Sequence, residues 1–179
     1  MSKSIRVAFC GILTAVCTLL MLLTGLIPIG TYALPALAGV LLVVPVIELG
    51  AGWAWPVYIA SSVLSLLLAG DKEAAMLFIV FFGYYPILKA AFEKLHRKYL
   101  SYLLKLLVFN ASMITGYFLS IWVLGVPEDS FTVFGVYLPG VLLLAGNLVF
   151  FVYDYAISTL VVTYCQRFHK IVSKWLRVK

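Results

Sequence analysis

Apolar residues fill most of this chain in long stretches that are separated by short groups of glycine, proline or charged residues. A stretch of about 20 apolar residues is the length of helix that crosses the hydrocarbon core of a bilayer. The pattern therefore predicts six membrane-spanning helices, at residues 5–26, 34–49, 53–68, 74–91, 102–124 and 140–164. Within the fourth, Pro86 predicts a kink or break, because proline lacks a backbone donor and clashes with the preceding turn.

The composition favours an all-α integral membrane protein whose single domain covers residues 1–179. Hydrophobic residues make up 64% of the chain and charged residues 11%, and the mean hydropathy is +1.11. Soluble domains contain about 25% charged residues, so this chain lies outside that class. The first apolar segment is too long for the core of a signal peptide, and we keep it as a span.

Basic residues between the predicted spans predict the orientation of the chain. With six spans, all 13 Lys and Arg residues except Lys72 lie on the side of the N-terminus. Because cytoplasmic loops are rich in Lys and Arg, both termini are predicted to be cytoplasmic. The net charge of +6 then reflects membrane orientation, and we expect no binding of nucleic acid. The basic tail at 165–179 either lies along the inner leaflet or extends the last helix into the cytoplasm.

Catalytic and cofactor motifs are not found in the sequence. Cys10, Cys17 and Cys165 lack the spacing of a metal site or a redox pair. The two histidines, His96 and His169, fall in basic segments typical of solvated surface. No phosphate-binding loop is present, so an ATPase activity would have to come from another chain. We therefore expect a non-enzymatic protein without a cofactor or bound metal.

Among ionisable residues within the predicted spans, where a charge is costly and needs a partner, three are candidates for a functional or structural network. These residues are Glu48, Lys89 and Asp154, all in the cytoplasmic halves of their helices. A pair between Lys89 and either Asp154 or Glu48 would neutralise charge inside the bundle. These residues then form a structural clamp or snorkel to the membrane interface, or they take part in coupling to a partner subunit or a proton path.

Polar and aromatic residues towards the outer side are candidates for binding a small organic ligand. Asn147 shares one face of the last helix with Asp154 and is either the floor of an outward-facing pocket or a polar contact between helices. The outer aromatic residues also suit an interfacial belt. The candidate ligand-binding residues are Tyr32, Glu73, Tyr117, Tyr137 and Asn147.

Small residues line one face of the first predicted helix, at Ala8, Gly11 and Ala15. Such a face allows another helix to approach closely. Together with six spans, the segment Leu34-Pro-Ala-Leu-Ala-Gly39 and the segment Phe82-Gly-Tyr-Tyr-Pro-Ile-Leu-Lys89, this face makes the chain resemble the substrate-binding S components of energy-coupling-factor (ECF) vitamin transporters.

The resemblance implies a bacterial plasma-membrane subunit that captures a vitamin-like molecule from outside. Its implied partners are a transmembrane coupling subunit, which docks on Ala8, Gly11 and Ala15, and two cytoplasmic ATPase subunits. Two other classes stay open. One is a small membrane scaffold or cell-envelope protein that recruits cytosolic partners, and the other is a membrane enzyme that uses Asp154 and Glu48.

Overall fold

The structure is a computed structural model that describes residues 3–27, 30–95, 97–125, 132–133, 136–137 and 139–176. His96, expected at the surface, lies outside these residues. The first half of the chain forms α1 (Lys3–Leu23), α2 (Gly30–Leu41), α3 (Val43–Glu48), α4 (Ala51–Leu68), α5 (Lys72–Leu77) and the π-helical turn η1 (Phe78–Phe82). The second half forms α6 (Tyr85–Phe92), α7 (Lys98–Leu124), α8 (Pro139–Arg167) and α9 (His169–Leu176).

Six helical stretches in the described residues are long and apolar enough to cross a membrane, as the sequence predicts. The second runs through α2 and α3, and the fourth runs through α5, η1 and α6. The second stretch begins at Gly30 and the fifth at Lys98, each four residues before its predicted start at 34 or 102. A two-residue antiparallel pair, β1 (Thr132–Val133) and β2 (Val136–Tyr137), lies between α7 and α8 and was not expected.

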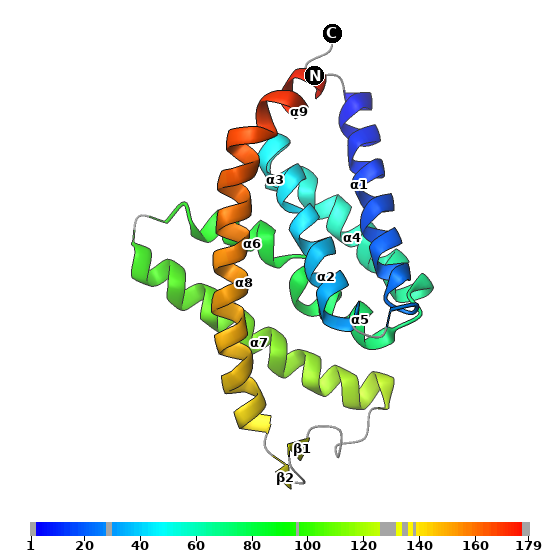
Figure 1. The fold of residues 1–179 in the computed structure, drawn as a ribbon, viewed down its shortest axis with the longest axis vertical. Coiled ribbons are helices and arrows are strands. Elements are labelled where there is room, and N and C mark those ends of the chain that lie inside the picture. Colours follow the sequence, from blue (N-terminus) through cyan, green and yellow to red (C-terminus); the bar gives the residue numbers. More distant parts are fainter. Residues whose placement is uncertain are drawn as a thin grey trace.

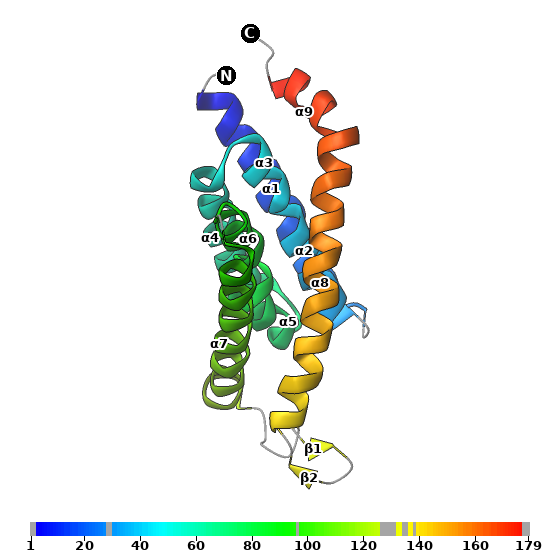
Figure 2. The same cartoon turned by 90° about the vertical axis from the view of Figure 1, so that its left-hand side faces the viewer.

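The fourth stretch occupies the centre of the bundle. In an apolar segment of 18 residues within it, 50% of the residues are buried inside the protein, against 17% in the equivalent segments of α7 and α8. Helices α1, α2 and α4 pack together on one side, and α7 crosses α8 on the other (Figure 1, Figure 2). The two ends of the chain lie at the same end of the molecule (Figure 1).

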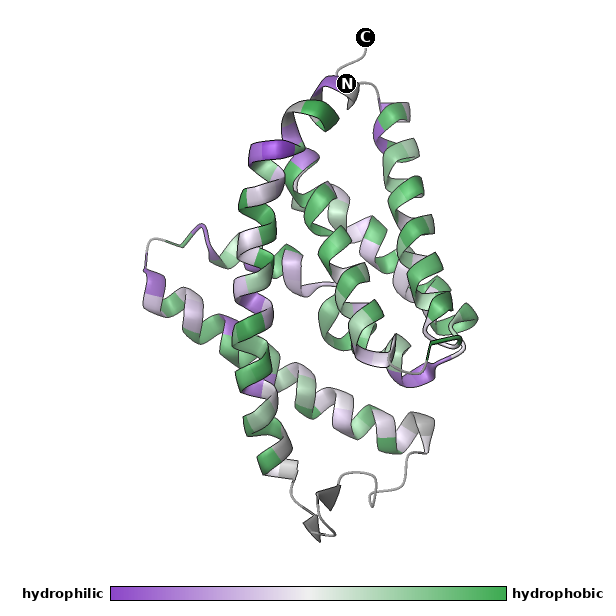
Figure 3. Cartoon of the chain, in the orientation of Figure 1, coloured by the Kyte–Doolittle hydropathy of each residue, from purple (hydrophilic) through white to green (hydrophobic). Residues whose placement is uncertain are grey.

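Large apolar side chains cover the outside of the helices. Hydrophobic residues predominate along all the long helices, and hydrophilic residues occur at helix ends and at a few places within α7 and α8 (Figure 3). Examples from four helices are Ile12, Leu67, Leu107 and Leu148, which are all exposed. Because lipid is as apolar as these side chains, this surface suits a bilayer and is incompatible with a soluble monomer.

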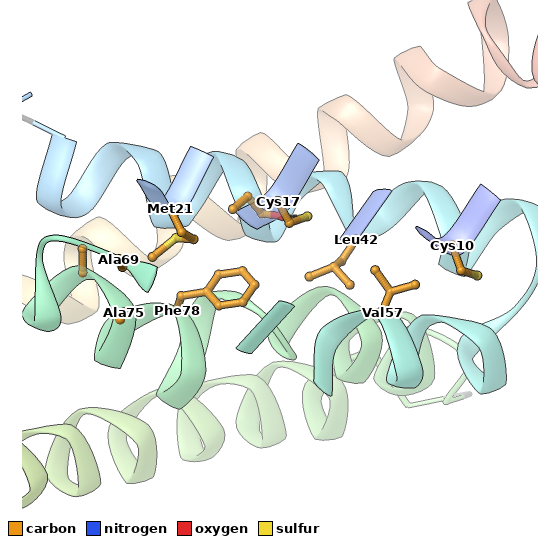
Figure 4. Packing of buried hydrophobic residues seen from close by; sticks show 10 residues of the cluster. Cys10, Cys17, Met21, Leu42, Val57, Ala69, Ala75 and Phe78 are labelled. Carbon is orange, nitrogen blue, oxygen red and sulfur yellow. Dashed lines mark hydrogen bonds between the residues drawn. The ribbon is translucent and has the colours of Figure 1, made fainter. Parts of the chain in front are cut away.

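The core has two parts. In the first, Cys17 and Met21 of α1 face Leu42, Val57 of α4 and Phe78 of η1 (Figure 4). In the second, aromatic rings join the centre of the bundle to α7 and α8. The Phe81 ring lies 5.2 Å from the Phe109 ring and 6.0 Å from the Phe150 ring, and Phe109 stacks on Phe150 at 4.7 Å.

The break predicted at Pro86 is present and has an unusual form. The chain makes the π-helical turn η1, closed by the Gly83 amide donating to the Phe78 carbonyl at 2.8 Å, and then starts α6 at Tyr85. Because Pro86 has no N–H, the Phe82 carbonyl lacks the donor that a continuous helix would supply. Gly39 of α2 packs directly on this carbonyl, so that a Cβ at position 39 would lie 2.3 Å from the Phe82 oxygen.

Candidate functional site

A network of charged side chains joins α6 to α8. Lys89 of α6 forms an ion pair with the carboxylate of Asp154 of α8. The Lys89 ammonium also donates to the Asp154 carbonyl at 3.2 Å and to the Ser158 hydroxyl at 2.8 Å. The Tyr85 hydroxyl donates to Asp154 Oδ1 at 2.6 Å. Lys89 is therefore paired with Asp154, one of the two partners that the sequence suggested.

Two further residues, Lys105 of α7 and Glu93 at the end of α6, complete the network. Lys105 Nζ lies 2.8 Å from Glu93 Oε1 and 3.2 Å from Asp154 Oδ2, and Lys89 Nζ lies 2.8 Å from Glu93 Oε1. In the sequence, Glu93 falls between the fourth and fifth predicted spans and Lys105 near the cytoplasmic start of the fifth, and neither was predicted to join Lys89 and Asp154. The sequence feature that could have pointed to Glu93 is its spacing from Lys89, because residues four apart on a helix are neighbours.

The network is electrically balanced, with two ammonium groups and two carboxylates. The side chains of Lys89, Lys105 and Asp154 are 2%, 5% and 11% exposed, while Glu93 reaches solvent at 44%. Partial burial would raise the pKa of Glu93, but hydrogen bonds and charge from Lys105 and Lys89 outweigh it and hold that pKa below its ordinary value. The arrangement ties α6, α7 and α8 together and satisfies every charge locally.

Glu48 does not join this network, so the predicted trio divides into two sites. Its side chain, 3% exposed, accepts a hydrogen bond from the Tyr164 hydroxyl at 2.9 Å and lies 2.9 Å from His169 Nδ1. These contacts connect the end of α3 to the junction of α8 and α9. His169, expected to be a solvated surface residue, is thus partly buried with a carboxylate partner. The sequence indicated neither contact, because 121 positions separate Glu48 from His169.

Asn147 contacts Asn110 of α7. The Asn110 amide donates to Asn147 Oδ1 at 2.9 Å, and the Asn147 amide donates to Asn110 Oδ1 at 3.0 Å. Each side chain also donates to a carbonyl of its own helix, Leu106 or Leu143. Asn147 therefore makes the polar contact between helices that was the alternative to a pocket floor.

The other candidate ligand residues are spread over the end where α2 and α5 begin and the last third of α7. Tyr32 is 68% exposed and Glu73 is exposed in the first turn of α5. Next to them, the Thr31 hydroxyl donates to Asp71 at 2.7 Å, and Asp71 caps α5. Tyr117 is partly buried and packs edge-on to Phe118. The side chain of Tyr137 in β2 lies outside the described part of the structure.

The structure shows an open depression of about 660 Å³ at the start of α7, lined by Arg97, Lys98, Tyr99, Leu100 and Leu103. It lies at the opposite end of α7 from Tyr117 and contains none of the candidate ligand residues. Among the described residues, no group of three or more metal-ligating side chains comes together.

The small-residue face of α1 points away from the rest of the chain. Ala8, Gly11 and Ala15 are all exposed, and a Cβ at Gly11 would meet no atom within 4 Å. The opposite face of the same helix carries Cys17 and Met21, which are buried against the bundle. The chain therefore covers one side of α1 and leaves the small-residue side open.

Comparison with protein-family models, curated proteins and solved structures finds no match to this chain.

Proposed function

We propose that this protein is a substrate-binding S component of an ECF-type importer in a bacterial plasma membrane. In this proposal it captures a vitamin or similar small micronutrient from outside and delivers it through a transmembrane coupling subunit. Two partner ATPase subunits supply the energy, and the protein itself performs no catalysis. The N-terminus, the C-terminus and the charged network lie towards the cytoplasm.

The observation that carries the proposal is the uncovered face of α1 formed by Ala8, Gly11 and Ala15. Small residues let two helix backbones approach closely, and in lipid this close packing drives helix association. The chain's own helices use the other side of α1, so a helix of a coupling subunit has free access to this one.

A second observation supports the resemblance on which the proposal rests. The two sequence segments that carry it, 34–39 and 82–89, contact each other in the fold. Gly39 of the first packs on the Phe82 carbonyl of the second, next to the break at Pro86. The two segments that carry the resemblance therefore pack against each other in the structure.

The proposal is tested by purifying the protein from its native host with its partners. The unchanged protein should bring down a transmembrane subunit and two ATPases. Gly11→Leu and Ala15→Leu should each reduce this recovery at least about tenfold, because a branched side chain separates the helices. Ala111→Leu, at an exposed small position of α7, is the matched control and should leave recovery unchanged.

Mass spectrometry of molecules released from the purified protein provides the second arm. A single vitamin-like compound supports the transport function, and it should remain bound to the Gly11→Leu variant. Absence of both a bound ligand and associated ATPases would refute the proposed transport function. That result would favour a membrane scaffold, for which the basic and aromatic depression at Arg97 and Tyr99 offers a surface for a cytosolic partner.

A further inference from the structure

The last helix, α9, is a separate element and does not continue α8. The Phe168 amide still closes the final turn of α8 on the Tyr164 carbonyl at 2.9 Å. A new helix then starts, with the amides of Ile171 and Val172 donating to the Phe168 carbonyl at 3.0 Å. The chain changes direction at this point, at the end of the molecule where both termini lie (Figure 1, Figure 2).

Glu48 of α3 fixes this change of direction. It binds Tyr164 in the last part of α8 and His169 in the first turn of α9, each at 2.9 Å. The ring of Phe168 stacks on that of Tyr164 at 6.3 Å with an interplanar angle of 23°. These four residues, Glu48, Tyr164, Phe168 and His169, form what we call the elbow. Because it connects three helices through a nearly buried carboxylate, it sets the position of α9.

The elbow leaves apolar side chains exposed next to positive charge, at the residue before α9 and in its first turn. Phe168 is 52% exposed and Ile171 is 57% exposed. Arg167 and Lys174 are also exposed. From position 167 to position 179 the sequence contains no acidic residue, and its basic residues are Arg167, Lys170, Lys174, Arg177 and Lys179.

We propose that α9 is an interfacial helix that binds the anionic lipid headgroups of the leaflet at this end of the bundle. Exposed apolar groups beside several basic residues are the features with which a helix enters the headgroup region of an anionic membrane. Each Lys or Arg near an anionic surface adds to the attraction. The elbow holds α9 at the end of a spanning helix, within reach of that surface. This inference does not depend on the transport function.

The test uses the full protein reconstituted in nanodiscs of phosphatidylcholine, with or without phosphatidylglycerol. A fluorescent probe is attached to Ile171→Cys in a Cys165→Ser background, since Cys165 is the exposed cysteine among the three. In anionic discs the probe should emit at shorter wavelength and be shielded from aqueous iodide. In neutral discs at the same salt concentration it should be accessible.

The substitutions Arg167→Gln and Lys174→Gln each remove one positive charge. Each should lower the equilibrium constant for insertion of the probe into the anionic headgroup region about fivefold. Lys72→Gln, which removes a basic residue at the opposite membrane face, should have no effect. High salt should reduce shielding in the protein with all its basic residues, which tests the charge effect without a variant that risks misfolding. Equal iodide access in both lipid compositions, or shielding insensitive to salt and to the two substitutions, would overturn the proposal.

Discussion

At the scale of single residues, the charged network joins α6, α7 and α8 through two lysines and two carboxylates. Lys89 and Lys105 are almost completely buried in a bundle whose exterior is apolar. Burying a charge without a partner is far more costly than burying a matched pair. The network has no excess charge, and every member has at least one partner of opposite sign.

Asp154→Asn should therefore destabilise the protein strongly. The change leaves Lys89 and Lys105 with only Glu93 as a counter-charge, and breaking a buried pair typically costs about 3–5 kcal/mol. The measurement is the melting temperature of the purified protein in detergent. Lys89→Met combined with Asp154→Asn should cost less than the sum of the two single changes. Glu73→Gln at an exposed position is the control, and equal melting temperatures for it and Asp154→Asn would contradict the prediction.

The sequence predicted part of this network. Lys89 and Asp154 were identified because charges inside apolar segments are rare and require partners. Glu48 met the same criterion, yet it binds Tyr164 and His169 of a different region. Which charge meets which depends on the rotation and tilt of each helix, and these are set by packing between segments far apart in the chain.

At the scale of elements, α2 and α4 pack on the helix interruption at η1 in the centre of the bundle. Groups of two neighbouring helices contact backbone carbonyls of this turn. The Tyr58 hydroxyl of α4 donates to the Ile79 carbonyl at 2.7 Å, and Gly39 of α2 lies against the Phe82 carbonyl. The sequence predicted the break from Pro86, but the contacts of α2 and α4 with it come only from the fold.

Gly39→Ala should destabilise the protein, although alanine is the better helix former. Its Cβ would lie 2.3 Å from the Phe82 oxygen, so α2 must move away from the central helix. Overpacking of this kind typically costs about 1–3 kcal/mol. The matched control is Gly11→Ala on α1, where the Cβ meets nothing within 4 Å. Thermal unfolding in detergent should show a lower melting temperature for the first variant only, and equal values would mean that α2 is not packed as described.

At the scale of the whole molecule, the six spans together with the distribution of basic residues predict that the two faces of the protein differ in charge. The first residue of α5 is Lys72, which the predicted topology places on the opposite side of the membrane from all other basic residues. The segment after α6 contains Lys94 and Arg97, which are exposed. One complete span, from α5 to α6, lies between these two places.

Single cysteines at these two places should react from opposite sides of the membrane. In cells that carry the Cys165→Ser background, Lys72→Cys should react with a membrane-impermeant maleimide added outside. Lys94→Cys should react only after the membrane is opened, because basic loops stay in the cytoplasm. The control is the background protein without an added cysteine, and labelling of both positions from outside would exclude the proposed orientation.

The sequence by itself determined the number of spans and the approximate position of each. A backbone in lipid must satisfy its own hydrogen bonds, so long apolar stretches have little choice but to form helices. The tertiary structure alone decided which polar groups meet, that Asn147 binds Asn110 and that Glu48 holds α9 at the elbow. It also decided that Ala8, Gly11 and Ala15 of α1 face outward. These outcomes depend on how each helix is rotated and tilted, and only contacts between distant segments fix that geometry.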